Sequence, residues 1–352
     1  MTHSARYIEL GSMVNRRGAL SRGIATAVLC AAPAVRGQDA EPVVLAVPGP
    51  GSSVSAMPEL AQRLGADRAE GLALRFKFTG GGGIAIRELR NGNAAFGVFG
   101  LSAAMHENLG GRHLVALAAL EDRVPLSLMV RASLKGVVRS VADLRGRAVG
   151  VHASSLSTVT NSQQVLRLLL RQAGVAFDDV RLVAAGQTWE SQAAALRSGV
   201  VDATVSEEPF GLRQELEGLS FGLVRLGRGD RALGLPGEGF LRGTLISTAA
   251  LVERQPHLAE RMVRVMQRAL AWRLAQGPDA VVAQLGQTGA AAEAFATMLR
   301  QYPRQFSSDG RFSTAQLAET ELFFRESLDN SPEARALRIE SMVVDRWAGR
   351  KP

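Results

Sequence analysis

The sequence predicts an α/β fold in which two similar lobes each contain a largely parallel sheet. Short apolar runs rich in β-branched residues are followed by glycine-rich turns and then by segments with helical spacing of apolar residues. This alternation starts at 42–47 and restarts at 126–130. A helix that ends at a glycine before a strand recurs at 89–92 and at 196–199. The alternation is typical of α/β proteins. The recurrence suggests two similar lobes, although any joint between a helix and a following strand can look like this.

The elements follow in order from the same patterns. Strands are predicted at 42–47, 72–78, 95–99, 114–120, 126–130, 147–151, 180–184 and 203–206. Most of these strands end in glycine-rich or polar turns that lead into helices. Helices are predicted at 55–64, up to Leu89, 140–144 with Ser140 as N-cap, 157–172, 191–197, 257–275, 278–286, 290–300 and 313–328.

Residues 1–37 are predicted to be a signal peptide for export by the Sec or the twin-arginine (Tat) route. The pair Arg16-Arg17 precedes a short apolar stretch at 23–34, which is too short to span a bilayer. Small residues then occupy the positions preferred before a cleavage site. We therefore expect a mature periplasmic chain that begins near Gln38.

The charge of the chain argues against nucleic-acid binding. The 352 residues carry a formal net charge of +8, and residues 1–37 hold five arginines against one glutamate. The other basic residues form no run that could follow a phosphate backbone. With 46% hydrophobic residues the chain can bury the cores of about two domains. Beyond the N-terminus it has no apolar stretch of about 18 residues that would span a membrane.

Two motifs about fifty residues apart make the chain recognisable. They are S-V-A-D-L-R-G-R-A-V-G-V at 140–151 and G-V-V-D-A at 199–203, and they are extended by E-E-P at 207–209 and L-I-S-T at 245–248. With these motifs the chain resembles the nitrate/sulfonate/taurine-type substrate-binding proteins of ABC importers, a group that also contains binders of thiamine pyrimidine precursors. The resemblance covers most of residues 42–275.

The resemblance implies a type II periplasmic-binding-protein-like fold with two α/β lobes, a ligand cleft and two hinge crossings. Lobe 1 would comprise 42–123 plus 235–352, and lobe 2 would comprise 124–234. The crossings are expected at 122–125 and in the glycine-rich stretch 227–239, which could absorb a hinge rotation. The resemblance also implies an exported component of an ABC importer. Its partners would be a small-molecule ligand and an ABC permease in the inner membrane, and we expect a monomer.

The ligand is expected beyond the carboxyl ends of the strands, as in other open α/β sheets. Loops at these ends precede helices, whose free N–H groups and dipoles attract an anionic group such as carboxylate, sulfonate or phosphate. The hydroxyls of the serine-rich loop 153–158 could bind such a group, although Ser157 alternatively only caps a helix. We predict a small anionic solute and these ligand-binding residues: Ser52, Ser53, Thr79, Gly80, Gly81, Ser102, Ser154, Ser155, Ser157, Thr158, Trp189 and Glu207.

Several of these residues have a second interpretation. The glycine loop 80–83 is either an anion-binding nest or a flexible turn. Trp189 is a candidate for stacking on a ligand. Glu207 most simply belongs to a pair of acids at a helix N-terminus with Pro209 at the first helical position, and alternatively meets a ligand amine. His152 is favoured as a loop histidine without a ligand role.

The sequence offers little to suggest catalysis or metal binding. Apart from the short spacing Gly-x-Ser-x-Gly at 218–222, which is weak evidence alone, it contains no His-Glu-x-x-His motif, and Cys30 is the only cysteine. We therefore expect a binding protein without cofactor or metal rather than an enzyme. Two alternatives stay open, a biosynthetic enzyme of the pyrimidine-precursor-synthase type on the same fold and an exported ligand-sensing protein.

Overall fold

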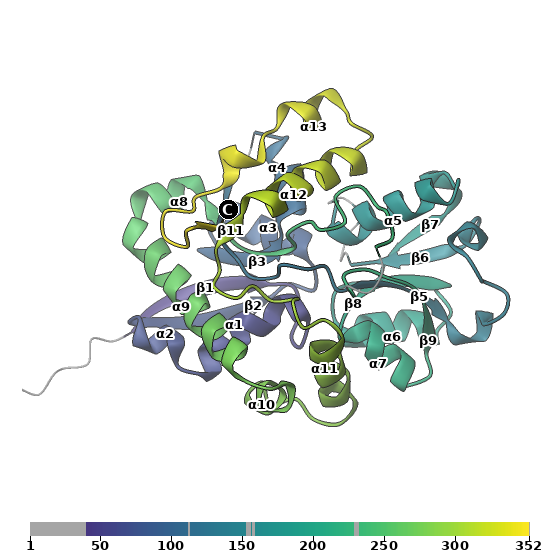
Figure 1. The fold of residues 1–352 in the computed structure, drawn as a ribbon, viewed down its shortest axis with the longest axis horizontal. Coiled ribbons are helices and arrows are strands. Elements are labelled where there is room, and N and C mark those ends of the chain that lie inside the picture. The colour runs from purple at the N-terminus through teal and green to yellow at the C-terminus, as the bar shows by residue number, and fades with distance from the viewer. Residues whose placement is uncertain (1–39, 112, 153–155, 157–158, 229–231, 352) are drawn as a thin grey trace, which may run out of the picture. The chain divides into compact units, whose positions relative to one another are not determined.

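The computed structural model describes residues 40–351 with gaps at 112, 153–155, 157–158 and 229–231. The predicted signal peptide lies outside the described residues. The described chain contains two five-stranded sheets, each covered by helices, and a small two-stranded sheet of β11 (Phe312–Ser313) and β12 (Arg350–Lys351) (Figure 1). We call the part built on the first five-stranded sheet the first lobe and the part built on the second the second lobe.

The first sheet has the strand order β2-β1-β3-β10-β4. The strands are β1 (Glu41–Val47), β2 (Leu72–Phe78), β3 (Phe96–Gly100), β4 (Leu114–Ala119) and β10 (Gly243–Thr248). β1 pairs in parallel with β2 and β3, whereas β10 is antiparallel to both β3 and β4. The buried strand β4 consists only of leucine, valine and alanine, as expected for a strand covered on both faces.

The second sheet repeats this arrangement with the order β7-β6-β8-β5-β9. Its strands are β5 (Leu126–Arg131), β6 (Ala148–Val151), β7 (Arg181–Ala184), β8 (Ala203–Glu207) and β9 (Ser220–Arg225). β6 is parallel to β7 and β8, and β5 is antiparallel to β8 and β9. In each sheet the fourth position is held by the first strand after a chain crossing, β10 in the first sheet and β5 in the second. The prediction of two similar α/β lobes is therefore confirmed. The prediction that their sheets are largely parallel is wrong, because two of the four strand pairs in each sheet are antiparallel.

The longer helices follow the strands in the alternation that the sequence predicts. They are α1 (Ser53–Arg63), α3 (Gly82–Arg90), α4 (Leu101–Asn108), α5 (Asn161–Gln172), α6 (Trp189–Arg197), α7 (Phe210–Leu216), α9 (Pro256–Ala275), α10 (Pro278–Gln284), α11 (Gly289–Gln301) and α12 (Thr314–Ser327). The short elements are α2 (Ala66–Ala69), α8 (Ala249–Arg254), α13 (Pro332–Ala336) and four 3₁₀ turns, η1 (Ala132–Leu134), η2 (Val141–Leu144), η3 (Phe177–Asp179) and η4 (Ile339–Met342). Among the described helices, none is both long and apolar enough to cross a bilayer.

Two helix starts differ from the prediction. α5 begins at Asn161 with Thr160 as its N-cap, so Ser157 does not cap it. Thr160 is the N-cap because Gln163 completes a capping box with it. In this box the side chain of each residue accepts a hydrogen bond from the backbone N–H of the other. α7 has Pro209 as its N-cap and not as its first helical residue. The predicted cap at Ser140 is confirmed, since Ser140 and Asp143 form a capping box.

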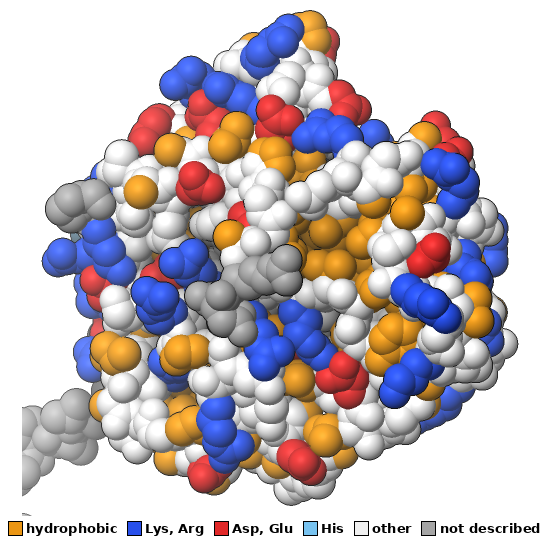
Figure 2. Space-filling view, turned by 45° about the vertical axis from the view of Figure 1, so that its right-hand side comes forward, with side chains coloured by type: hydrophobic (Ala, Val, Ile, Leu, Met, Phe, Trp, Pro, Cys, Tyr) orange, Lys and Arg blue, Asp and Glu red, His pale blue; other side chains and the backbone are white. Residues whose placement is uncertain are grey.

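Helices of the first lobe also contact the second lobe. α11 packs on α7, and α12 packs on α5 (Figure 1). Arg171 of α5 pairs with Glu326 of α12 at 2.8 Å. Basic side chains on the face drawn in Figure 2 lie among acidic, apolar and uncharged ones. The two lobes are thus joined by side-chain contacts as well as by the chain crossings.

Candidate functional site

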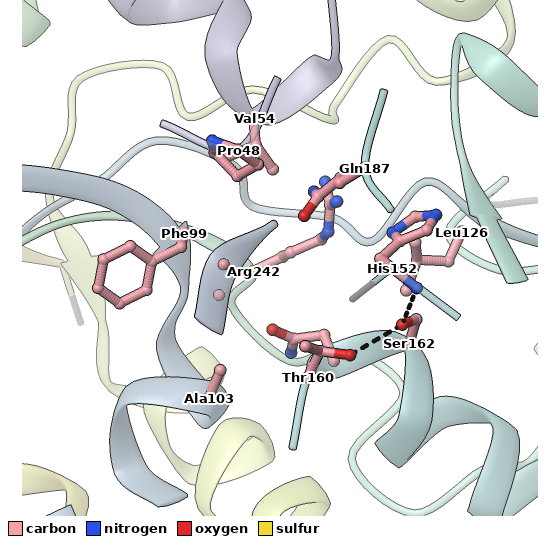
Figure 3. Close-up of a pocket in the computed structure, with 13 residues that line it drawn as sticks. Pro48, Val54, Phe99, Ala103, Leu126, His152, Thr160, Ser162, Gln187 and Arg242 are labelled. Atoms are coloured by element: carbon pink, nitrogen blue, oxygen red, sulfur yellow. Dashed lines mark hydrogen bonds between the residues drawn. The ribbon is translucent and has the colours of Figure 1, made fainter. Parts of the chain in front are cut away.

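Four helix N-termini and the loop before a fifth helix converge where the two lobes meet. α1, α3 and α4 begin there from the first lobe, α5 begins there from the second, and Gln187 lies in the loop before α6. Between them lies a cavity of about 30 Å³, which has room for about one water molecule. Its walls are formed by Pro48, Val54, Gly82, Phe99, Gly100, Ala103, Leu126, His152, Thr160, Asn161, Ser162, Gln187 and Arg242 (Figure 3). The two lobes therefore meet around a small space that is lined by both apolar and polar side chains.

Arg242 supplies the positive charge of this site. It directly precedes β10, and its side chain is only 3% exposed. Its Nη1 donates to Glu121 Oε2 at 2.8 Å and to Ser53 Oγ at 3.0 Å, and its Nη2 donates to Glu207 Oε2. Burial is strongly unfavourable for an isolated charge, so these contacts are what permits a guanidinium here. Two carboxylates thus surround one guanidinium.

Glu207 lies behind the cavity wall and is fully buried. It is the last residue of β8, so it belongs to the second lobe while Arg242 and Ser53 belong to the first. Its Oε1 accepts a hydrogen bond from Gln187 Nε2 at 3.0 Å. Its Oε2 accepts from Arg242 and, at 3.5 Å, from Ser53 Oγ. Glu207 therefore connects the two lobes at the centre of the closed cleft.

His152 supports Glu207 from the end of β6. Its Nε2 accepts a hydrogen bond from the backbone N–H of Glu207 at 3.0 Å, so the ring is neutral. Burial, and to a lesser extent the positive charge of Arg242, lowers the pKa of His152 to about 3. The backbone N–H of His152 donates to Ser162 Oγ, whose hydroxyl also bonds Thr160 (Figure 3). His152 consequently lines the cavity with its ring nitrogen bonded to the backbone. The interpretation that it has no ligand role stays a prediction.

A second set of contacts across the cleft centres on Ser102. Its hydroxyl, at the start of α4, accepts from Asn161 Nδ2 at 2.7 Å and donates to Gln164 Oε1 at 2.6 Å. Asn161 and Gln164 both belong to the first turn of α5 in the other lobe. The approach is close, because a Cβ built on Gly100 would lie 1.5 Å from Asn161 Oδ1. The absence of a side chain at position 100 lets α5 reach the first lobe.

The glycine loop after β2 makes a third set of contacts. Gly80 O accepts from the backbone N–H of Gln187 at 2.8 Å. Thr79 Oγ1 donates to the carbonyl oxygens of Val47 and Gly81, at 3.1 and 3.0 Å, so its hydroxyl proton is used inside the loop. A Cβ on Gly49 would meet Gln187 O at 2.3 Å. Backbone therefore meets backbone here when the lobes are together.

All of the predicted ligand residues except Trp189 fall into three groups. Ser53, Ser102, Gly80 and Glu207 take part in contacts across the cleft, as described above. Ser52 caps α1 by accepting from Ser55 N at 3.3 Å, while Thr79 and Gly81 bond within their own loop. Ser154, Ser155, Ser157 and Thr158 lie outside the described residues.

Trp189 lies apart from the cavity around Arg242. It is 8% exposed and packs against Phe210, with the guanidinium of Arg213 3.9 Å from its ring centre. It borders a separate pocket of about 210 Å³ between α6, α7 and α11. Both partners of the Trp189 ring, Phe210 and Arg213, therefore come from its own lobe.

The acidic pair of the sequence is divided between two sites. Glu208 points away from the cavity, where it binds Arg225 at 2.7 Å, Ser127 Oγ at 2.5 Å and the backbone N–H of Leu212 at 2.7 Å. Burial raises the pKa of Glu208, and Arg225 opposes that rise. The interpretation of both acids as residues at a helix N-terminus thus fits Glu208 but is wrong for Glu207.

Sequence reasoning missed the residues that complete the network, namely Arg242, Glu121, Gln187 and Asn161. Arg242 stands in the run F-L-R-G-T, where the neighbouring residues are apolar or small. A lone arginine between buried residues just before a strand is the one signal that could have identified it, because such an arginine requires a buried partner.

Among the described residues no group of three or more His, Cys, Asp and Glu side chains is arranged to hold a metal ion.

Solved structures with the same fold include several binding proteins. A protein of Bordetella bronchiseptica RB50 has a TM-score of 0.77 and 20% identity, covering 89% of this chain and 96% of that one. The alkanesulfonate-binding protein SsuA of Xanthomonas axonopodis pv. citri has a TM-score of 0.66 and 17% identity, covering 89% and 100%. The nitrate-binding protein NrtA of Synechocystis PCC 6803 has a TM-score of 0.66 and 11% identity, covering 87% and 86%. These likenesses confirm the predicted periplasmic-binding-protein-like fold.

The same fold also occurs in an enzyme. The desulfurization enzyme DSZB is similar with a TM-score of 0.58 and 18% identity, covering 87% of this chain and 97% of that one. No curated protein sequence matches the chain. The family model described as NMT1/THI5 like matches residues 60–280, which is more than half of the 352 residues. The chain therefore belongs to the NMT1/THI5-like family.

Proposed function

We propose that this protein is the exported substrate-binding component of an ABC importer, and that it traps a small polar solute between its two lobes. The observation that carries the proposal is the cavity enclosed by both lobes, whose walls come together through Glu207–Arg242, Ser102–Asn161 and Gly80–Gln187. All three contacts join groups on different lobes. Separation of the lobes would break them together and expose the cavity.

The chain crossings support a hinge mechanism. Strand β4 ends at Ala119 and β5 begins at Leu126, while β9 ends at Arg225 and β10 begins at Gly243. We propose that these two connections are the hinges and that the lobes correspond to 42–123 plus 235–352 and to 124–234. A solute that binds the closed form better than the open form would shift the population toward closure. A permease in the inner membrane would then recognise the closed form.

Binding is better supported than catalysis by the described part of the site. Ser53 Oγ bonds Arg242 and Glu207, whereas His152 Nε2 accepts from a backbone amide. No described serine–histidine pair at this cavity therefore has the hydrogen bond that activates a nucleophile. The similarity to binding proteins for alkanesulfonate and nitrate favours the same conclusion.

The nature of the solute follows from the helix N-termini. Their dipoles favour a group with acceptor character, and the sequence predicts an acidic one held by backbone amides and the loop 153–158. The closed cavity of about 30 Å³ is too small for such a solute, so binding requires that the lobes separate by more than the described structure shows. Periplasmic location and export by Sec or Tat complete the proposal.

The experiment that tests this function is the identification of a bound solute. The protein is purified from its native host without denaturation, and the ligand released by unfolding is analysed by mass spectrometry. We expect one small polar compound in stoichiometric amount, which rebinds and changes the small-angle X-ray scattering profile. A protein that releases no compound, and whose scattering is unaltered by extracts of host growth medium, would contradict a trapping function.

A further inference from the structure

The cation of this cleft already holds an anion. Among the described residues, Arg242 is the one arginine or lysine that lines the cavity. It donates to the carboxylate of Glu207, as do Gln187 of the cavity wall and Ser53 next to it. Helix α1 begins at Ser53, so its positive end faces the same carboxylate. We infer that Glu207 is an internal counter-anion that fills the anion subsite while the lobes are closed, so that a simple monoanion can bind there only by displacing it from Arg242, and that the site therefore selects against simple monoanions. This inference rests on the proposed function.

The charge of the cluster leads to the same conclusion. Glu121 and Glu207 face one guanidinium, so two carboxylates surround Arg242 within a buried region. Glu121 is also bound by Gln305 Nε2 at 3.0 Å on the side of the first lobe. A monoanion placed next to Glu207 would meet a like charge in a medium that screens little. The cluster offers it no free cation in compensation.

The remaining polar lining groups among the described residues add no charge that would offset that of Glu207. Thr160, Asn161, Ser162 and the neutral His152 contribute uncharged polar atoms. The wall at Glu207 therefore selects a solute whose group there is an uncharged donor, such as an amide or sulfonamide N–H. An acidic group elsewhere on the same solute would have to lie away from Arg242. Glu207 is thus a specificity-determining residue for this pocket.

Two probes of equal size separate charge from shape. Methanesulfonate is an anion at neutral pH, whereas methanesulfonamide is neutral and has N–H donors. We would titrate the full-length mature protein with each probe by ligand-observed NMR at one fixed ionic strength, since screening alters exposed charges. We expect the wild-type protein to bind methanesulfonamide at least about tenfold more tightly than methanesulfonate. A wild-type preference for methanesulfonate would overturn the inference without any variant.

The substitution Glu207→Gln removes the charge but keeps the size of the side chain. Because a hydrogen bond to a charged group is worth about ten- to a hundredfold in affinity, methanesulfonate binding should rise by that factor. Glu215→Gln is the matched control, because it removes one negative charge of the second lobe that pairs with Arg225 outside this cluster. The control should keep the wild-type order of the two probes.

Each outcome of this experiment decides the inference. Equal gains in both variants would mean that net charge and not the subsite governs anion binding, and an unchanged Glu207→Gln protein would mean that Glu207 does not fill an anion subsite. Either result overturns the inference. The proposed function would survive both, since it is judged separately by the solute released from the native protein.

Discussion

Arg242 illustrates at the scale of single residues why a buried charge needs a full set of partners. Its neighbours Glu121 and Glu207 are each at most 1% exposed, so all three charges have lost their water. Burial raises the pKa of Glu121, and the positive charge of Arg242 opposes that rise. Removing one partner of such a cluster typically costs about 3–5 kcal/mol, because the others stay buried without compensation. The position of each lobe is therefore tied to a few hydrogen bonds at the cleft.

The pH dependence of stability should reveal the neutral His152. Its pKa is about 3 in the folded protein and near 6.5 in the unfolded chain, so the unfolded state takes up a proton first as pH falls. The stability from this group is complete above pH 6.5 and is lost as pH falls toward 3, by at most about 1.4 kcal/mol per pH unit. Urea unfolding at several pH values between about 7 and about 5 measures the slope.

His152→Gln provides the comparison for that slope. Glutamine keeps an acceptor for the N–H of Glu207 but has no titratable ring. The variant should show a flatter dependence of unfolding free energy on pH than the wild-type protein. The raised pKa values of Glu121 and Glu208 act in the opposite direction and are common to both proteins. Parallel profiles for the two proteins would rule out a buried neutral histidine.

Sequence reasoning could place the loops of the site but not its charged pairs. Ser53, Ser102 and Gly80 were predictable, because they follow strands at the edge where helices begin. Glu121 and Arg242 are 121 positions apart, and their contact depends on β10 entering the sheet beside β4. Local patterns contain no information about such a pairing. The role of Glu207 was ambiguous for the same reason, since only the fold decides which of two adjacent acids faces the cleft.

At the scale of elements, the start of α5 matters most for the site. The predicted start of this helix at Ser157 was wrong. Serine and threonine both cap helices well, so the local sequence does not decide which of several neighbouring hydroxyls is the N-cap. The reciprocal bonds of Thr160 and Gln163 fix the first turn, including a 2.8 Å bond from Thr160 N to Gln163 Oε1. That turn contains Asn161 and Gln164, which meet Ser102 across the cleft. The cap therefore positions a contact between the lobes.

Removal of the cap should weaken the protein in a measurable way. Thr160→Ala deletes the side-chain acceptor and should lower the free energy of unfolding by about 1 kcal/mol, the usual value of an N-cap. Thr160→Ser keeps the hydroxyl and is expected to stay within about 0.5 kcal/mol of the wild type. Chemical denaturation followed by circular dichroism measures both. Equal losses in the two variants would attribute the effect to the methyl group and not to the cap.

At the scale of the whole molecule, the closed arrangement depends on backbone that fits closely between the lobes. Gly49→Ala would place a Cβ 2.3 Å from Gln187 O, which belongs to the main chain and cannot rotate away. Overpacking of this kind typically costs about 1–3 kcal/mol. The free energy of closure should therefore become less favourable than in the wild-type protein by about that amount. We expect the solute-free variant to have a larger radius of gyration than the wild-type protein in small-angle X-ray scattering.

Gly277→Ala is the control for this substitution. A Cβ at Gly277 meets no atom within 4 Å, and its φ of −73° suits any residue. The control should scatter like the wild-type protein. If Gly49→Ala behaved in the same way as this control, the lobes would not close along the Gly49–Gln187 contact.

The placement of β10 has a consequence for the order in which the chain can be completed during synthesis. All five strands of the second sheet lie between Leu126 and Arg225, so a ribosome delivers that sheet as one uninterrupted segment. The first sheet has β10 between β3 and β4, and the place between these two strands stays empty until Gly243–Thr248 has been synthesised. The lobe that begins first is thus finished last. Arg242 arrives together with β10, after both of its carboxylate partners have already been made.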